Sequence, residues 1–162
     1  LQEKFNAQLL FQVTDDEKFL YRDTLSMEDV KKMTMDNLLD IIAVGFDPKR
    51  TQILIDIQKI QELYPISVRV AKAITFSTVK AVFGFEDSTN IGMIFFPSIQ
   101  AAPAFLYSEK LGKPVPCLIP AAIDQDNFWR MTRDIAEKLG YYKPAQVADT
   151  TDIQQIKNQL IT

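Results

Sequence analysis

Short apolar runs alternate with longer stretches of helical periodicity along the chain. Residues 9–13 form an apolar run that ends in the acidic residues 15–17, which predicts a buried strand that delivers polar groups at its C-terminal end. Residues 52–57 predict a second buried strand, and residues 117–123 predict a third. Buried strands that alternate with helices indicate an α/β fold, an open parallel sheet covered by helices on both faces.

The clearest helix signal follows the first acidic cluster. Ser26 is a good N-cap with Asp29 at the third helical position, and Gly45 and Pro48 close the helix. One apolar stripe is predicted to face the core, and it consists of Val30, Met33, Leu38, Ile41 and Ile42.

Further helices are predicted in the remainder of the chain. Residues 58–73 favour a helix that is disturbed or restarted at Pro65, and residues 76–83 and 91–105 are also helical in part of their spacing. The polar residues 124–127 cap a last helix that ends at Gly140. The buried face of that last helix includes Met131, Ile135 and Leu139.

Ligands of open parallel sheets bind beyond the carboxyl ends of the strands. The polar residues 14–17 and 124–126 would both lie at that edge, although acidic residues there are often only helix caps and solvated loops. Gln12 and Gln100 are amides set in apolar stretches, and a buried amide needs hydrogen-bond partners. Those partners could be structural groups or a ligand.

Composition narrows the classes of function. The 162 residues suit one compact domain, and 21 acidic against 18 basic side chains give a net charge of −3, which offers no broad attractive field for a polyanion. The single cysteine, Cys117, and the absence of histidine exclude an internal disulfide framework and the common zinc-ligand sets, which fits a cytoplasmic protein. No secretory signal begins the sequence, and polar residues and prolines interrupt the uncharged stretch 88–108, so we expect no membrane span.

The sequence lacks the residues that several common types of active site and nucleotide-binding site require. There is neither a Gly-x-Gly-x-x-Gly fingerprint nor a phosphate-binding loop motif, and there is no histidine to serve as the base of a hydrolase triad. Asp15, Asp16 and Glu17 could hold a hard divalent cation, but three consecutive residues cannot all face one ion from a strand.

Three blocks of sequence resemble, in the same order, blocks of the archaeal and eukaryotic type of tryptophanyl-tRNA synthetase. They are residues 12–18 (QVTDDEK), residues 91–97 running on to 100–103 (IGMIFFP, QAAP) and residues 117–126 (CLIPAAIDQD). Residues 40–47 and 140–143 also resemble this family. The resemblance implies a class I synthetase core with a Rossmann-like sheet, which activates L-tryptophan with ATP and Mg²⁺ and transfers it to tRNA(Trp).

The resemblance also assigns roles to individual residues. It implies that Gln12 accepts a hydrogen bond from the indole N–H and that Glu17, Gln100 and Gln125 hold the ammonium group of tryptophan. A site built around such a hydrogen bond can reject an analogue without the N–H by about 10⁴ to 10⁵. Trp129 stands where the family has an aromatic residue near the substrate, with core packing as the alternative. Gln125 and Lys18 are the candidate ATP contacts, and the resemblance implies no metal ligand from this chain.

The sequence departs from the class I pattern in two ways. It has neither the His-Ile-Gly-His type signature nor the Lys-Met-Ser-Lys-Ser type loop, so the catalytic signature residues are unknown here. We expect residues 1–147 to belong to the catalytic domain and residues 148–162 to be a helical segment that follows an ATP-signature loop absent from this sequence.

Other functions remain open at this stage. A tyrosyl-tRNA synthetase relative would share the fold and the ATP chemistry, and Asp124 or Asp126 could imitate its aspartate for the phenol. A non-catalytic binding protein could have kept the synthetase fold, and a carboxylate-metal hydrolase could use the acidic cluster. The resemblance further implies a homodimer, to which the apolar stretch 91–105 could contribute.

Overall fold

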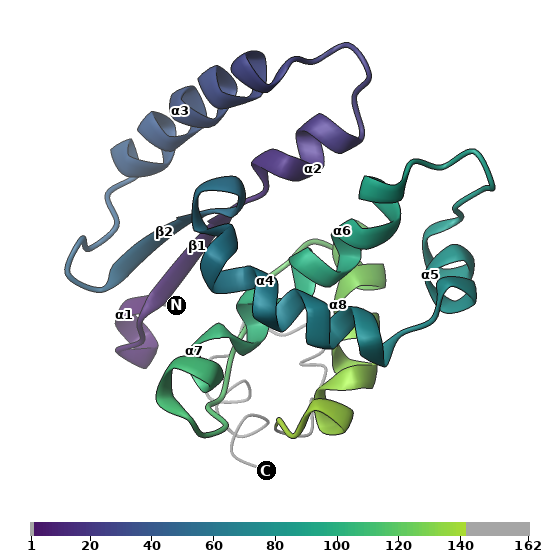
Figure 1. Ribbon diagram of the computed structural model, residues 1–162. Coiled ribbons are helices and arrows are strands. Elements are labelled where there is room, and N and C mark those ends of the chain that lie inside the picture. Colours follow the sequence, from purple (N-terminus) through teal and green to yellow (C-terminus); the bar gives the residue numbers. More distant parts are fainter. Residues whose placement is uncertain (1, 142–162) are drawn as a thin grey trace.

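A computed structural model describes residues 2–141 (Figure 1). Its only sheet in that range is a parallel pair, β1 (Leu9–Val13) and β2 (Thr51–Ile55), in the register Leu9 to Thr51 through Val13 to Ile55. Helices account for most of the other described residues. In chain order they are α1 (Gln2–Phe5), α2 (Asp15–Leu20), α3 (Met27–Ala43), α4 (Asp56–Ala73), α5 (Phe76–Phe83), α6 (Ile91–Ala101), α7 (Pro103–Leu111) and α8 (Asp126–Ala136), with the 3-10 turns η1 (Ile123–Gln125) and η2 (Glu137–Leu139) around α8.

The two faces of the strand pair meet different helices. Successive side chains of a strand point to opposite faces, and Leu10 and Leu54 pack into the main core with α4, α6 and α8. Phe11, one position on, contacts Phe46, which follows α3, with ring centroids 5.8 Å apart. The described sheet is therefore covered on both faces, as the sequence predicts, and Figure 1 shows α3 and α4 on different sides of the strands.

The prediction of a third strand at residues 117–123 is wrong. Residues 114–122 carry no regular secondary structure, and Ile123 begins η1. An apolar run forms a strand only when another strand pairs with its backbone, and in residues 2–141 no strand pairs with this segment. The apolar pattern alone could not reveal that missing partner.

Helix α3 confirms its predicted start and corrects its predicted buried face. The Ser26 hydroxyl accepts from the Asp29 backbone N–H, and the Asp29 carboxylate accepts from the Ser26 backbone N–H, which completes a capping box. Val30 and Leu38 are buried as expected, but Met33 and Ile42 are 40% and 59% exposed. Thr34 takes a buried place instead. The stripe is therefore narrower than the one that the apolar residues predict.

Helix α4 runs unbroken through Pro65, which corrects the predicted disturbance there. Proline removes one backbone donor from a helix and crowds the preceding turn. Leu63, Ile66 and Val70, on either side of Pro65, are at most 3% exposed. The burial of these three side chains offsets the local cost and keeps the helix continuous.

Helices α6 and α7 meet at Pro103, where their axes bend by 50°. No single helix in residues 2–141 is long and apolar enough to cross a membrane, and α6 and α7 meet the length and composition criteria only as this bent pair. Most of α6 from Phe96 onward is buried against other helices of the fold. From Phe96 to Phe105 the apolar stretch is thus mostly core sequence, whereas Ile91 at its start is 80% exposed.

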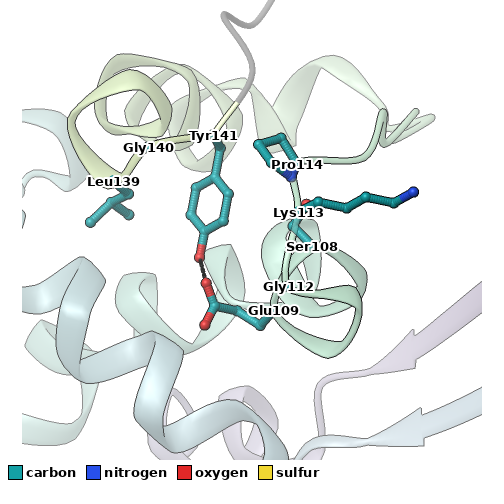
Figure 2. A pocket seen from close by; sticks show the side chains of 8 residues that line it. All are labelled: Ser108, Glu109, Gly112, Lys113, Pro114, Leu139, Gly140 and Tyr141. Atoms are coloured by element: carbon teal, nitrogen blue, oxygen red, sulfur yellow. Dashed lines mark hydrogen bonds between the residues drawn. The ribbon is translucent and has the colours of Figure 1, made fainter.

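A polar network ties α4, α7 and η2 together. Arg69 donates to Glu109 at 2.6 Å and to the Leu139 carbonyl oxygen at 3.1 Å, and the Tyr141 hydroxyl donates to Glu109. The Tyr141 ring also stacks on Phe105 at 4.3 Å. Figure 2 shows the Tyr141 side chain reaching Glu109. Both residues line a hollow of about 240 Å³.

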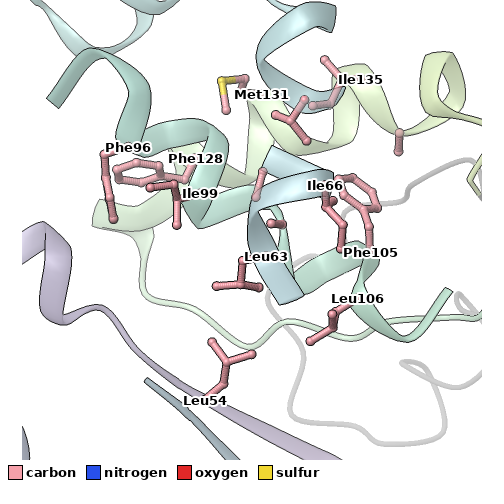
Figure 3. Packing of buried hydrophobic residues seen from close by; sticks show 14 residues of the cluster. Leu54, Leu63, Ile66, Phe96, Ile99, Phe105, Leu106, Phe128, Met131 and Ile135 are labelled. Atoms are coloured by element: carbon pink, nitrogen blue, oxygen red, sulfur yellow. The ribbon is translucent and has the colours of Figure 1, made fainter. Parts of the chain in front are cut away.

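The main core lies between the strands and the helices α4, α6, α7 and α8 (Figure 3). Phe96 is fully buried, and its ring meets Tyr21 and Phe128 edge to face at 6.1 and 5.9 Å. Met131 and Ile135 are buried as predicted, whereas Leu139 falls in η2 and only packs against the margin of the core. Gly140 ends this region with φ of +82°, as predicted for a helix-terminating glycine. The core therefore fixes α2, α6 and α8 relative to the strands.

Candidate functional site

Polar side chains gather where the two strands end. Because β1 and β2 are parallel and in register, Val13 and Ile55 lie at the same edge of the sheet. Residues 14–17 follow β1 there, and Asp56 follows β2 as the first residue of α4. The carboxyl edge of a parallel sheet is the usual ligand-binding edge of this fold, so the first predicted cluster lies where a site is expected.

Asp56 is the most buried polar residue of this edge, with 0% of its surface exposed. Gln12 Nε2 donates to Asp56 Oδ2 at 2.8 Å, while Asp56 Oδ1 is buried and has no partner among the described residues. Burial, and next the negative charge of Asp16, raise the pKa of Asp56 to about 8. The group is thus a buried carboxyl that resists ionisation.

Asp15 and Asp16, which follow β1, accept hydrogen bonds from backbone N–H groups of α4 and α2 at this edge. Asp15 is 8% exposed, and its Oδ1 accepts from the Ile57 backbone N–H at 3.0 Å, in the first turn of α4. A carboxylate at a helix N-terminus satisfies a free backbone donor and meets the positive end of the helix dipole. Asp16 accepts from the Glu17 backbone N–H at 2.9 Å, and burial is the main cause that raises its pKa to about 6.

Glu17 and Lys18 occupy different sides of α2. Glu17 is half-buried, and its Oε2 accepts from the Thr14 hydroxyl at 2.9 Å. Helix α2 packs against α4 and against α6, the helix that carries Gln100. Lys18 is exposed. The carboxylate expected to meet an ammonium group is therefore held at the inner side of the edge, and the candidate ATP contact faces solvent.

Gln12 points to the core face of the strands. It lies opposite Leu54 in the parallel register, and Leu54 is fully buried in the main core. Cross-strand partners present their side chains on the same face. Gln12 is therefore on the side of the sheet that α4, α6 and α8 cover, together with Gln100 and Trp129.

Gln100 and Trp129 each keep one polar atom without a partner. Gln100 is 7% exposed on α6, and its Oε1 is buried with no hydrogen bond among the described residues. Trp129 packs against the core from α8, and its indole Nε1 is likewise unpaired. Buried polar atoms in native proteins usually have a partner, which can be water or a ligand. The packing role expected as the alternative for Trp129 is real, and its N–H is still free for a further contact.

Gln125 lies at the turn between the irregular segment and α8. It is the last residue of η1 and the residue before α8, and its Nε2 donates to Asp124 Oδ2 at 3.3 Å. Its position after a strand was expected, but the segment before η1, residues 114–122, is irregular. Among the described residues no hydrogen bond joins Glu17, Gln100 and Gln125 to one another.

Asp56 was missed in the sequence because it follows Ile53, Leu54 and Ile55 and precedes Ile57. The apolar run made it a strand residue, and the strand ends one residue before it. The sequence feature that could have identified Asp56 is a single carboxylate inside a run of isoleucines and leucine. A buried charge in such a run is costly unless it has a partner, so it indicates a polar contact.

The hollows of the structure lie away from this edge. The one in Figure 2 is lined by Ser108, Glu109, Gly112, Lys113, Pro114 and residues 139–141, and another of about 290 Å³ lies between Arg69, Lys72, Ala73, Lys138 and Leu139. Arg69, Glu109 and Tyr141, which line them, are engaged with one another in a single network. We therefore assign these hollows a structural role and place the candidate site at the strand edge.

Comparison with known proteins gives one consistent result. No family model matches the chain. The tryptophan–tRNA ligase of Pyrobaculum calidifontis is 54% identical over 145 residues, which are 90% of this chain and 39% of that protein. The tryptophanyl-tRNA synthetase of Encephalitozoon cuniculi, solved bound to tryptophan, superposes with a TM-score of 0.83 at 40% identity and covers 88% of this chain and 40% of that one. The chain thus spans less than half the length of these relatives.

A tyrosine enzyme is less similar. The tyrosyl-tRNA synthetase of Archaeoglobus fulgidus, solved with L-tyrosine, reaches a TM-score of 0.64 at 18% identity. That likeness extends to the fold alone. The parallel strands and surrounding helices match the Rossmann-like fold of both kinds of synthetase, and the sequence similarity selects the tryptophan enzymes.

Proposed function

Because this chain belongs, as a segment, to the tryptophanyl-tRNA synthetase family, we propose that the protein containing it activates L-tryptophan with ATP and transfers it to tRNA(Trp). The carboxylate of tryptophan attacks the α-phosphate of ATP, pyrophosphate leaves, and a terminal hydroxyl of the tRNA then displaces AMP from the adenylate. Such chemistry needs positioned reactants and stabilised charge rather than a nucleophilic side chain. The absence of histidine from this chain is compatible with it.

The observation that carries the proposal is the buried Oε1 of Gln100, an acceptor that has no hydrogen-bond partner among the described residues. Gln12 lies on β1, Glu17 on α2 and Gln100 on α6, and α2 packs against α6. Glu17 supplies a charge opposite to that of an ammonium group, and the amide oxygens of Gln100 and Gln125 accept its remaining protons. Gln12 offers an acceptor for the indole N–H.

Trp129 and Lys18 complete the proposed contacts. The Trp129 ring lies beside the core on α8, and we assign it the aromatic wall of the tryptophan pocket. Lys18 and Gln125 would meet ATP, since Lys18 is an exposed cation on α2 and Gln125 sits at the turn before α8. Mg²⁺ would arrive with ATP and neutralise its phosphates; in residues 2–141 no group of three or more Asp, Glu, His or Cys side chains is arranged to hold a metal ion.

Other parts of the proposal rest on the family likeness alone. We propose that residues 1–147 belong to the catalytic domain and that residues 148–162 form a helical segment after the ATP-signature loop. We also propose that the whole protein acts as a cytoplasmic homodimer. The boundary at residue 147 lies outside the described residues. The tRNA is bound mainly by other parts of the protein, which agrees with the net charge of −3.

The test is tryptophan-dependent exchange of pyrophosphate into ATP by the full-length protein. Glu17→Ala and Gln125→Ala are each expected to lower kcat/KM for tryptophan by about 10² or more, because a desolvated ammonium group is left short of partners. Asp23→Ala is the matched control, since Asp23 is an exposed carboxylate beyond α2. Unchanged exchange in both site variants contradicts the proposed pocket. A wild type that binds tryptophan without any exchange contradicts the proposed activity and supports a non-catalytic binding protein.

A further inference from the structure

The contact between Gln12 and Asp56 fixes more than the position of an amide. A glutamine side chain ends in an acceptor oxygen and a donor nitrogen of nearly the same size, so the amide can face a ligand with either group. In the structure Nε2 donates to Asp56 Oδ2 at 2.8 Å, and Oε1 has no partner among the described residues. The neighbour of Gln12 therefore determines which group is left over for a ligand.

We propose that Asp56 is a specificity-determining positioning residue, which holds the Gln12 amide with its oxygen toward the site so that it accepts from the indole N–H of tryptophan. The inference rests on the proposed function and adds to it a residue that does not touch the substrate. In this role Asp56 acts on the substrate through Gln12, from the N-terminus of α4.

Burial makes this control effective. Asp56 is fully buried, and Gln12 is half-buried on the core face next to fully buried Leu54. Water cannot readily replace a carboxylate at that place, and a buried amide pays for an unmade hydrogen bond with its desolvation free energy. With Asp56 ionised, the reversed amide would direct Oε1 against a carboxylate oxygen, where two acceptors face each other.

The observed orientation is compatible with a protonated Asp56. The hydrogen bond from Gln12 uses Oδ2, while Oδ1 has no partner among the described residues. A proton carried on Oδ1 leaves Oδ2 as a carbonyl-like acceptor for the same bond. Asp56, with its raised pKa, can therefore keep the same hydrogen bond when the proton is on Oδ1.

The experiment measures discrimination rather than activity alone. The ratio of kcat/KM for tryptophan to kcat/KM for its benzothiophene analogue, in which sulfur replaces the indole N–H, is determined by pyrophosphate exchange with the full-length protein. Asp56→Asn keeps the shape of the side chain but offers either a donor or an acceptor to Gln12, so we expect the ratio to fall about threefold. Asp56→Leu leaves the Gln12 amide without its hydrogen-bond partner, so we expect the ratio to fall about tenfold. Ser67→Ala, a buried polar change on the same helix, is the matched control and should leave the ratio unchanged.

A double-mutant cycle separates this role from a merely structural one. Gln12→Leu should lower the ratio at least as far as Asp56→Leu, and adding Asp56→Leu to Gln12→Leu should lower it no further, because residues that act through one contact are not additive. An unchanged ratio in both Asp56 variants, or a further fall in the double variant, overturns the inference while the wild type still activates tryptophan. A wild type with no tryptophan-dependent exchange overturns the proposed function instead.

Discussion

Replacing Asp56 by asparagine removes a carboxyl group that titrates differently in the folded and unfolded protein. Asp56 is fully buried, and burial together with the charge of Asp16 raises its pKa to about 8 in the folded state. An aspartate in an unfolded chain titrates near pH 4, at about 3.9. Between these values the folded protein keeps a proton that the unfolded chain has released. The free energy of unfolding is therefore highest at low pH for this group and falls as the pH rises toward 8.

The size of the effect follows from the two pKa values. Each unit of difference is worth about 1.4 kcal/mol, so a gap from about 3.9 to about 8 sets a ceiling of roughly 6 kcal/mol. Asp16 shares part of this free energy, because each carboxylate raises the cost of ionising the other. We expect the wild type to lose about 2 to 4 kcal/mol between about pH 5 and about pH 8.5 through this pair.

Asp56→Asn should flatten that decline. The variant is expected to be about 2 kcal/mol more stable than the wild type at about pH 8.5 and equal to it or about 1 kcal/mol less stable at about pH 5, where the carboxyl is already neutral. Urea unfolding followed by circular dichroism at several pH values measures both slopes, with Asp23→Asn as the exposed-carboxylate control. Parallel pH dependence of the wild type and Asp56→Asn would refute the reasoning.

Two further predictions concern packing and helix capping. Gly92→Ala would place a Cβ 2.2 Å from Leu20 Cδ2 and 3.3 Å from Leu20 Cγ, between α2 and α6. We expect the free energy of unfolding, measured in urea, to fall by about 1 to 3 kcal/mol, and the KM for tryptophan to rise because α2, with Glu17, is displaced from α6. An unchanged KM would show that this close approach does not position Glu17. Ser26→Ala removes the side-chain half of the α3 capping box and should cost about 1 kcal/mol without a change in KM, and a shift in KM would contradict the placement of α3 outside the site.

Local signals predicted the fold where the determining contacts are near in sequence. The capping box at Ser26 and the helix end at Gly140 depend on neighbouring residues, and both predictions are confirmed. The failures depend on distant partners. Residues 117–123 look like a strand, but pairing decides a strand, and Met33 and Ile42 look like core residues, but the width of the covering surface decides burial.

The features of the candidate site likewise fall into those that the sequence predicts and those that depend on distant residues. The apolar surroundings of Gln12 and Gln100 indicated buried amides in need of partners, and the free Oε1 of Gln100 agrees with that expectation. The partner of Gln12 could not be predicted, because Asp56 lies 44 residues away and meets it only through the parallel register of β1 and β2. The roles of Gln12, Glu17, Gln100, Gln125 and Trp129 toward tryptophan stay predictions.

The central claim is that this chain forms the tryptophan pocket of a tRNA synthetase, and amino-acid-dependent pyrophosphate exchange by the full-length protein tests it most directly. Exchange is measured with tryptophan and with tyrosine at equal concentrations. We predict exchange with tryptophan and a kcat/KM for tyrosine lower by about 10³ or more, since the site presents an acceptor for an indole N–H. Exchange that tyrosine supports as well as tryptophan does, or no exchange with either amino acid, would contradict the claim.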